Sequence, residues 1–285
     1  MSILITGAKG QLGTELRVLL DQRGIEYLGT DTAQLDITDQ EAVDVFFLHN
    51  KPTYVFHCAA YTAVDKAEDE GKAINQLVNV EGTENIARAS EKVGATLIYI
   101  STDYVFDGTK QEGEYSELDQ PNPQNEYGRA KYEGELAVQS ICSNYYIVRT
   151  SWVFGVYGNN FVYTMERLAK TNPKLTIVDD QFGRPTWTRT LAEFMIHLME
   201  SQPEHGIYHL SNDNSCSWYE FAVEILKDSD VKVAPIRSSD FPQKAKRPQY
   251  SILDLSKTKA TGFNIPTWQY GLAEFKEKVE EIKHD

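Results

Sequence analysis

Cysteine is scarce in this 285-residue chain, which contains Cys58, Cys142 and Cys216 and no others. An odd, scattered set cannot form a disulfide framework, and its positions match no metal-ligand spacing. We therefore expect small, buried, reduced thiols, which are typical of a cytoplasmic protein.

Long apolar runs and an excess of basic charge are also missing. No apolar run approaches the roughly 20 residues of a membrane-spanning helix. Residues 1–7 enter a strand pattern directly, which leaves no room for a signal peptide. The net charge of −14 at pH 7 argues against nucleic acids and anionic membranes as partners. A small anionic ligand stays compatible with this charge, because helix N-termini and single arginines can hold phosphate.

Tyr127 and Lys131 stand four residues apart in the stretch Tyr-Gly-Arg-Ala-Lys. On a helix, their side chains lie one turn apart on the same face. A phenol with an ammonium beside it can transfer a proton, because the cation favours the phenolate and lowers a pKa that is otherwise about 10. This spacing also arises by chance on many helices, so the prediction of catalysis needs support from elsewhere in the chain.

The first support is a glycine-rich turn that contains Gly7, Gly10 and Gly13. It follows a short apolar strand at 3–5 and opens a helical pattern, as in a dinucleotide-binding unit. Gly7 permits the tight turn, Gly10 lets the backbone approach a pyrophosphate, and Gly13 lets the helix pack closely. Asp31 follows the second predicted strand, where an acid commonly binds the adenosine ribose, although a solvated loop acid fits the same position.

Apolar strands alternate with helical segments up to about residue 150, which predicts an α/β protein with a parallel sheet. The predicted strands are 3–5, 25–28, 55–60, 96–100, 145–149 and, later, 207–210. Capping boxes are expected at Thr38/Glu41 and Ser217/Glu220. Polar residues follow the strand 96–100, where parallel sheets bind ligands. Residues 107–124 are expected to form a surface loop or a lid.

Together, eight stretches resemble the extended short-chain dehydrogenase/reductases and, within them, the dTDP-4-dehydrorhamnose reductase family. They cover the chain nearly end to end: 7–13, 57–65, 101–108, 127–131, 149–155, 157–161, 180–186 and 246–251. The resemblance implies a Rossmann-type doubly wound parallel sheet with a smaller C-terminal α/β substrate lobe. The expected domains are 1–151 plus about 186–211 for the NAD(P)-binding part, and about 152–185 and 212–285 for the lobe.

The implied reaction is reduction of the C4 ketone of dTDP-4-dehydro-L-rhamnose by NADPH or NADH, a step in making nucleotide sugars for cell-wall polysaccharide. The family's catalytic trio falls on Thr102, Tyr127 and Lys131. The resemblance implies that Tyr127 gives a proton to the ketone oxygen and that Thr102 binds the developing oxyanion. Lys131 would hold the nicotinamide ribose and lower the pKa of the phenol.

The resemblance also assigns binding residues. Those for the coenzyme are Gly7, Gly10, Gln11, Leu12, Gly13, Asp31, Asp36, Ile37, Ala59, Ala60, Tyr61, Thr62, Tyr127 and Lys131. Those for the sugar nucleotide are Thr102, Tyr104, Val105, Trp152 and Arg247, the last being a phosphate ligand or a surface charge. The runs 104–106 and 152–154 would form an apolar wall that suits the methyl group of a 6-deoxy sugar.

Three points stay open. Asp31 favours NADH, whereas Lys9 could offset the 2′-phosphate of NADPH. In some relatives glutamates bind Mg²⁺ between subunits, and Glu15 and Glu193 fall at matching places. Both also fit solvated helix acids and no third ligand is evident, so no metal is assigned. Monomer and homodimer are both compatible with the sequence.

Two other functions fit the same resemblance. The first is another epimerase, dehydratase or reductase acting on a nucleotide sugar. A dehydratase would place a glutamate two residues after the catalytic Thr, where this chain has Tyr104. The second is a non-catalytic NADP-binding subunit, such as the regulatory subunit of methionine adenosyltransferase. The intact trio of Thr102, Tyr127 and Lys131 favours an enzyme, because a binding subunit needs no proton donor.

Overall fold

The computed structural model describes residues 2–284, and within them six strands form a central parallel sheet in the order β10-β5-β4-β3-β1-β2. The strands are β1 (Ile3–Thr6), β2 (Leu28–Thr30), β3 (Tyr54–His57), β4 (Thr96–Thr102), β5 (Tyr145–Thr150) and β10 (Gly206–His209). The four inner strands β5, β4, β3 and β1 are rich in β-branched and aromatic residues and are mostly buried on both faces, as a covered parallel sheet requires. The predicted α/β parallel fold is confirmed, and the second strand lies closer to Asp31 than expected.

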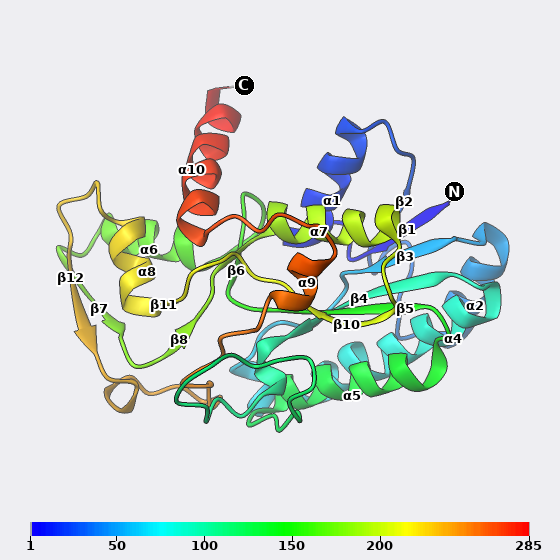
Figure 1. Cartoon of the computed structure of the whole chain (residues 1–285), viewed down its shortest axis with the longest axis horizontal. Helices are drawn as coiled ribbons and strands as arrows, with labels where there is room; N and C mark the ends of the chain where they lie inside the picture. The colour runs from blue at the N-terminus through cyan, green and yellow to red at the C-terminus, as the bar shows by residue number, and fades with distance from the viewer. Residues whose placement is uncertain (1, 285) are drawn as a thin grey trace.

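Helices cover both faces of this sheet (Figure 1). On one face lie α1 (Gln11–Gln22) and α7 (Thr188–Ser201), and on the other lie α2 (Gln40–Asn50), α4 (Thr83–Val93) and α5 (Glu126–Ile141). Side chains along β1 alternate between the two faces. Ile3 and Ile5 join the core under α1 and α7, whereas Leu4 joins the core under the other helices.

The helical region between β3 and β4 contains a wide turn. It comprises α3 (Lys72–Gln76), a π-helical segment η2 (Leu77–Gly82) and α4, and a short 3-10 turn η1 (Lys66–Glu68) precedes it. Such π turns are frequent at functional sites because they redirect single side chains.

The expected capping box at Thr38/Glu41 is wrong: Asp39 caps α2 by accepting from the Ala42 N–H. The Thr38 hydroxyl instead donates to the Asp36 carboxylate. Asp39, one position later, takes the N-cap place, for which aspartate is a preferred residue.

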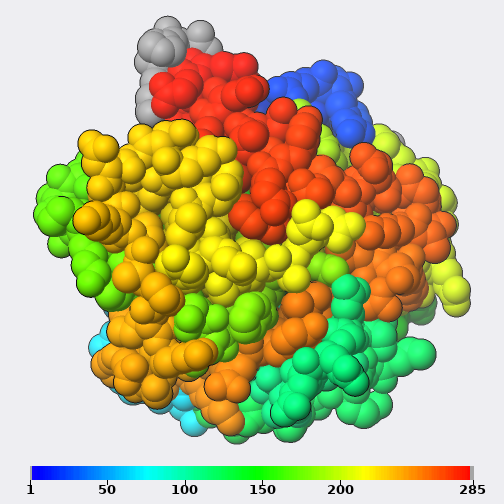
Figure 2. All heavy atoms as spheres, turned by 60° about the vertical axis from the view of Figure 1, so that its left-hand side comes forward, coloured from blue at the N-terminus to red at the C-terminus, as the bar shows by residue number. Residues whose placement is uncertain are grey.

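We call the second unit the C-terminal lobe, made of α6 (Phe161–Ala169), β7 (Lys174–Val178), α8 (Trp218–Ile225), β12 (Lys232–Ile236) and α10 (Trp268–His284). Its core contains Phe154, Phe221 and Phe275. Figure 2 shows its two chain segments, green and yellow to gold, side by side, as the parallel pairing of β7 with β12 requires. The expected capping box at Ser217/Glu220 starts α8 and is confirmed.

Short elements join the sheet to the lobe. They are η3 (Asp103–Val105), β6 (Val153–Phe154), β8 (Phe182–Gly183), β9 (Thr186–Trp187), β11 (Cys216–Ser217), η4 (Ser238–Asp240) and α9 (Ser256–Ala260). β6 pairs with β9, and β8 pairs with β11. The chain therefore passes from the sheet region to the lobe, returns through α7 and β10, and enters the lobe again. The domain limits given above stay a prediction.

The loop 107–124 is fastened to the protein instead of forming a free lid. Tyr115 is 4% exposed and stacks on Phe106 with ring centroids 4.4 Å apart. Arg184 forms an ion pair with Glu114, with 2.5 Å between Nη2 and Oε1. Within residues 2–284, no helix combines the length and apolarity needed to cross a membrane.

Candidate active site

A cavity of about 590 Å³ opens at the carboxyl edge of β1, β3, β4 and β5. This is the edge at which doubly wound sheets bind their ligands. The predicted site residues that line it are Gly10, Gln11, Leu12, Ala59, Ala60, Thr62, Thr102, Tyr104, Tyr127, Lys131 and Trp152. The sheet thus brings together residues from both ends of the sequence.

The glycine loop forms one end of this cavity. Gly7 has φ +66°, and a Cβ there would lie 2.7 Å from the backbone of Ala59. A Cβ at Gly13 would lie 2.2 Å from the Gly7 carbonyl oxygen, so α1 can pack this closely only without a side chain there. Gly10 is the N-cap of α1 and provides no side chain to cap its amides. The first turn of α1 therefore offers N–H groups and a positive dipole end at a place where a phosphate group fits.

The end of β4 and the start of α5 meet at the centre of the cavity. A Cβ at Gly128 would lie 2.2 Å from the Tyr104 carbonyl oxygen, so the glycine lets α5 approach this closely. Asn125 caps α5 by accepting from the Gly128 N–H at 2.7 Å. As a result, the Tyr127 ring meets the Tyr104 ring edge-on, with centroids 6.0 Å apart. The same approach brings the Tyr127 phenol within hydrogen-bond reach of the Thr102 hydroxyl.

Burial raises the pKa of Tyr127 above its usual value, and the neighbouring Asp103 and Tyr104 raise it further. The hydrogen bond with Thr102 acts in the opposite direction but is the smaller effect. The predicted lowering of this pKa is therefore wrong, because full burial beside an acid disfavours the phenolate. The phenol is fully protonated at neutral pH, which is the form that a proton donor needs.

Lys131 lies on the same face of α5 as Tyr127, and both line the cavity, as predicted from their spacing. Its ammonium lies 4.1 Å from the centroid of the Tyr99 ring, a cation–π contact. Burial lowers the pKa of Lys131 to about 7, against the opposing effects of Glu135 and Cys58. A small change around this group therefore decides whether it is charged at neutral pH.

A buried ion pair beneath Lys131 was not predicted. Arg149 donates to both carboxylate oxygens of Glu135, at 2.9 and 2.6 Å, and Ser101 donates to the same carboxylate at 2.5 Å. All three residues are at most 2% exposed. Glu135 follows Lys131 by four residues, just as Lys131 follows Tyr127, so helical periodicity extended by one turn would have found it.

Asp103 is another residue that sequence reasoning left without a role. It lines the cavity and is 2% exposed. Burial raises its pKa to about 7, while hydrogen bonds from Ser251 and Thr102 act to lower it. Strongly shifted acids of this kind gather at functional sites.

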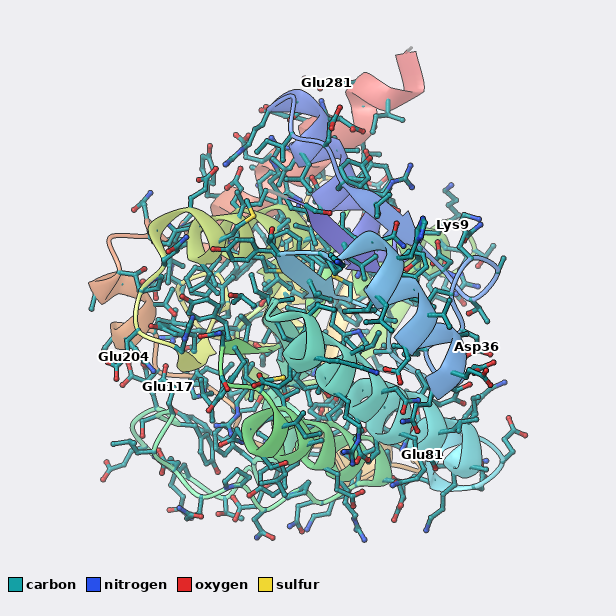
Figure 3. The ribbon with its side chains drawn as sticks, turned by 90° about the vertical axis from the view of Figure 1, so that its right-hand side faces the viewer. Lys9, Asp36, Glu81, Glu117, Glu204 and Glu281 are labelled. Carbon is teal, nitrogen blue, oxygen red and sulfur yellow. The ribbon has the colours of Figure 1, made fainter. Side chains whose placement is uncertain are left out.

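Some predicted coenzyme residues lie beside the cavity instead of in its wall. Both carboxylate oxygens of Asp31 accept from the backbone N–H of Lys9, at 3.2 and 3.0 Å, so Asp31 supports the glycine loop. Ile37 is 7% exposed and packs against Gly82. Figure 3 shows Lys9 and Asp36 on one side of the molecule, opposite Glu117 and Glu204.

The segment 59–62 is held from behind by Asn79, which stands in the π-helical turn. The Asn79 side chain accepts from the backbone N–H of Tyr61 at 3.0 Å and donates to its carbonyl oxygen at 2.9 Å. The wide turn of the helix thus gives an amide side chain to the loop that borders the cavity.

Two predicted substrate residues are placed differently from expectation. Val105 is fully buried in a small core with Phe106 and Tyr115, and it is not among the residues that line the cavity. Arg247 forms a two-point ion pair with Asp65, at 3.1 and 2.7 Å, and it also hydrogen-bonds Tyr104. Its guanidinium is therefore paired and partly buried, and its role as a phosphate ligand stays a prediction.

The apolar wall is narrower than predicted. Phe106 and Phe154 belong to the core at 0% and 1% exposure, whereas Trp152 and Val153 line the cavity. Trp218, which the sequence analysis missed, stacks on Trp152 with centroids 3.6 Å apart and 10° between the planes.

Glu15 and Glu193, the two residues that match a metal position in relatives, share the guanidinium of Arg189. Arg189 lies 3.4 Å from Glu15 Oε1 and 3.1 Å from Glu193 Oε1. Among residues 2–284, no three potential metal-binding side chains gather at one point. The cluster does not fit a divalent cation, since the arginine already supplies the positive charge.

The comparisons with known proteins agree with this geometry. The model of the RmlD substrate binding domain family matches residues 1–281. The chain belongs to this family. The spore coat polysaccharide biosynthesis protein SpsK of Bacillus subtilis (strain 168) is 41% identical over 276 residues, which are 96% of each chain.

Two solved structures show how closely the fold is shared. A dTDP-4-dehydrorhamnose reductase from Clostridium acetobutylicum superposes with a TM-score of 0.95 at 44% identity, covering 98% of this chain and 100% of that one. A dTDP-4-dehydrorhamnose reductase from Bacillus anthracis in complex with NADP superposes with a TM-score of 0.92 at 41% identity, covering 97% of this chain and 99% of that one. Within the RmlD family, the cavity described here therefore lies on a fold that binds a nicotinamide coenzyme in a solved relative.

Proposed function

We propose that this chain reduces the C4 ketone of dTDP-4-dehydro-L-rhamnose to give dTDP-L-rhamnose, with NADPH or NADH as coenzyme. The observation that carries the proposal is one cavity that contains a glycine-rich helix start together with Thr102, Tyr127 and Lys131. Solved relatives of the same length that are named dTDP-4-dehydrorhamnose reductase support the choice of substrate.

The residues at the glycine loop fit a dinucleotide. Small residues, Gly10, Ala59 and Ala60, border the cavity, and the N-terminus of α1 offers uncapped amides. This combination suits a pyrophosphate that must approach the backbone closely. A bound nicotinamide would supply the hydride for the ketone carbon.

The protein's own part in the reaction is proton transfer and orientation. Tyr127 gives its phenolic proton to the carbonyl oxygen as negative charge develops there. The Thr102 hydroxyl, which lies within hydrogen-bond reach of the phenol, helps to hold that oxygen. In its charged form, Lys131 attracts the Tyr127 phenolate that remains and so lowers the free-energy cost of the proton transfer.

The substrate preference follows from the cavity wall. Val64, Tyr104, Trp152 and Val153 present apolar or aromatic surface beside the catalytic cluster. The methyl group of a 6-deoxy sugar gains from such contact, whereas a hydroxymethyl group would be short of hydrogen-bond partners. An apolar pocket separates such pairs by only about 10²-fold, so discrimination should be moderate. The thymine base is assigned from the relatives' names alone.

The proposal places the protein in the cytoplasm, as a monomer or homodimer that needs no nucleic acid or membrane partner. Its test is an assay in which dTDP-4-dehydro-L-rhamnose is made in situ from dTDP-glucose by the two preceding enzymes. NADPH or NADH oxidation with dTDP-L-rhamnose as product supports it. No oxidation with either coenzyme contradicts it and leaves the non-catalytic binding subunit as the alternative. Equal activity on unrelated keto sugars would leave a general reductase.

A further inference from the structure

Trp152 has a backbone conformation that bulky residues rarely adopt. Its φ is +48°, in the left-handed region, where the side chain crowds the backbone. Residues held in this way persist only where their surroundings impose the conformation, and they gather at ligand-binding sites. Trp152 stands between β5 and β6 and lines the cavity, so the contacts that hold its indole bear on the binding site.

Trp218 covers one face of this indole. The two ring planes are 10° apart and their centroids are separated by 3.6 Å. Trp218 is the first residue of α8, whose start is fixed by the capping box of Ser217 and Glu220. On the lobe side, the Phe161 ring packs against Trp218 with centroids 4.6 Å apart. The supporting indole is therefore itself held by a helix start and a third aromatic ring.

Gly183 leaves room for the edge of the same indole. A Cβ at this position would lie 2.7 Å from Cε2 and 2.9 Å from Nε1 of Trp152. β8, which contains Gly183, pairs with β11, the strand directly before Trp218. One small two-stranded sheet thus supplies both the support for the face of Trp152 and the space for its edge.

We propose that Trp218 is a positioning residue for the sugar nucleotide: by stacking on Trp152 it fixes the apolar wall against which the sugar ring lies. The proposal rests on the proposed function for the identity of the sugar, and it adds a cavity residue that is absent from the coenzyme assignments above. A wall fixed before binding costs no ordering of side chains when the sugar arrives. Removal of Trp218 leaves Trp152 in an unfavourable backbone conformation without the stack that holds it.

The kinetic test compares Trp218→Ala and Trp218→Phe with Trp268→Phe. Trp268 is a matched control, since it is 4% exposed and packs against Phe221 in the core of the lobe. We expect Trp218→Ala to raise KM for the sugar nucleotide about 10- to 100-fold, with the Kd for NADPH unchanged. Trp218→Phe should restore part of the loss, and Trp268→Phe should keep the wild-type KM. An unchanged KM in Trp218→Ala, or an equal rise in the NADPH Kd, overturns the proposal.

A spectroscopic measurement tests the stack itself. Two parallel indoles in contact couple their transitions and give an exciton couplet in the circular dichroism spectrum. The couplet should be present in the wild type and in Trp268→Phe, and absent from both Trp218 variants. A wild-type spectrum without it overturns the geometry. If Trp218→Ala does not fold, Trp218→Phe decides both measurements, because it keeps an aromatic ring at the helix start.

The proposed function can fail separately from this proposal. If the wild type does not reduce dTDP-4-dehydro-L-rhamnose, the function is wrong, and calorimetric titration with dTDP-L-rhamnose then tests the stack without turnover. Weaker binding by Trp218→Phe than by Trp268→Phe supports the positioning role. Equal binding by these two variants overturns it.

Discussion

The hydroxyl of Thr102 donates a hydrogen bond to the carboxylate of Asp103, 3.1 Å away. This buried carboxylate therefore lies close to Tyr127, the proton donor of the cavity. Its pKa is raised to about 7, mainly by burial. The same carboxylate raises the pKa of Tyr127. Asp103 therefore helps to keep the Tyr127 phenol protonated. Burying the charged form of Asp103 opposes folding.

The stability of the protein should depend on pH through Asp103. Because its pKa is 3.8 in the unfolded chain and about 7 when folded, the folded protein binds the proton more tightly between these values. The contribution of Asp103 protonation to the stability of the fold is fully present below about pH 4 and is lost as the pH rises towards 7. Asp103→Asn should therefore gain stability relative to the wild type as pH rises, as measured by urea unfolding at about pH 4 and about pH 8.

Asp107→Asn is the control for this experiment. Hydrogen bonds from Thr109, Tyr115 and Asn122 lower the pKa of Asp107, overcoming the opposing effect of burial. Its contribution is thus present above the unfolded pKa of 3.8 and is lost only as pH falls through the lower folded pKa. The stability difference between Asp107→Asn and the wild type should therefore change little between about pH 4 and about pH 8. If both variants follow the wild type in parallel, Asp103 does not titrate as stated.

Tyr127→Phe keeps the ring and removes the proton donor. General acid catalysis contributes about 10²- to 10⁴-fold, so kcat should fall by that factor while the Kd for NADPH changes little. Tyr132→Phe is the matched control: Tyr132 lies on the same helix and packs against the small core of Phe106 and Tyr115. Near-wild-type turnover in Tyr127→Phe would remove this residue from the mechanism.

Gly10→Val tests the glycine loop. Since Gly10 lines the cavity at the start of α1, two methyl groups there should block a pyrophosphate from the backbone. We expect NADPH binding, followed by fluorescence titration, to be lost while the protein stays folded. Gly94→Ala serves as control because its new Cβ meets nothing within 4 Å, although its φ of +71° makes it somewhat less stable. Unchanged NADPH affinity in Gly10→Val would refute the assignment.

Removal of divalent cations with EDTA should leave both kcat/KM and Tm unchanged, because Arg189 occupies the position between Glu15 and Glu193. Arg189→Met should lower stability by about 1–3 kcal/mol, since it leaves a buried carboxylate without its charged partner. Arg88→Met breaks an exposed pair with Glu84 and should cost at most about 1 kcal/mol. A fall in Tm or activity on adding EDTA would contradict this picture.

Local patterns in the sequence were enough to predict the sheet and the position of the cavity. Gly7, Gly10 and Gly13 stand between a strand and a helix, and the spacing of Tyr127 and Lys131 places both on one face of α5. These features depend on residues close together in the chain, so periodicity and turn chemistry reveal them.

Contacts between segments far apart in the chain could not be predicted from the sequence. Trp218 meets Trp152 only through the pairing of β8 with β11, and Arg247 meets Asp65 across 182 positions of sequence. Burial also reversed a prediction: the spacing implied a lowered phenol pKa at Tyr127, but desolvation and Asp103 raise it. Sequence spacing shows which groups are near, whereas the cost of burying their charge depends on the whole fold.

The pairing of β10 with β5 has a consequence for synthesis on the ribosome. When residues up to Thr150 have emerged, β5 has a neighbour in β4 but its other edge awaits β10, which begins at Gly206. The nascent chain thus carries an open, apolar strand edge while the first part of the lobe is translated. Such an edge invites pairing with other chains, so this interval is the point at which a chaperone would protect the growing polypeptide.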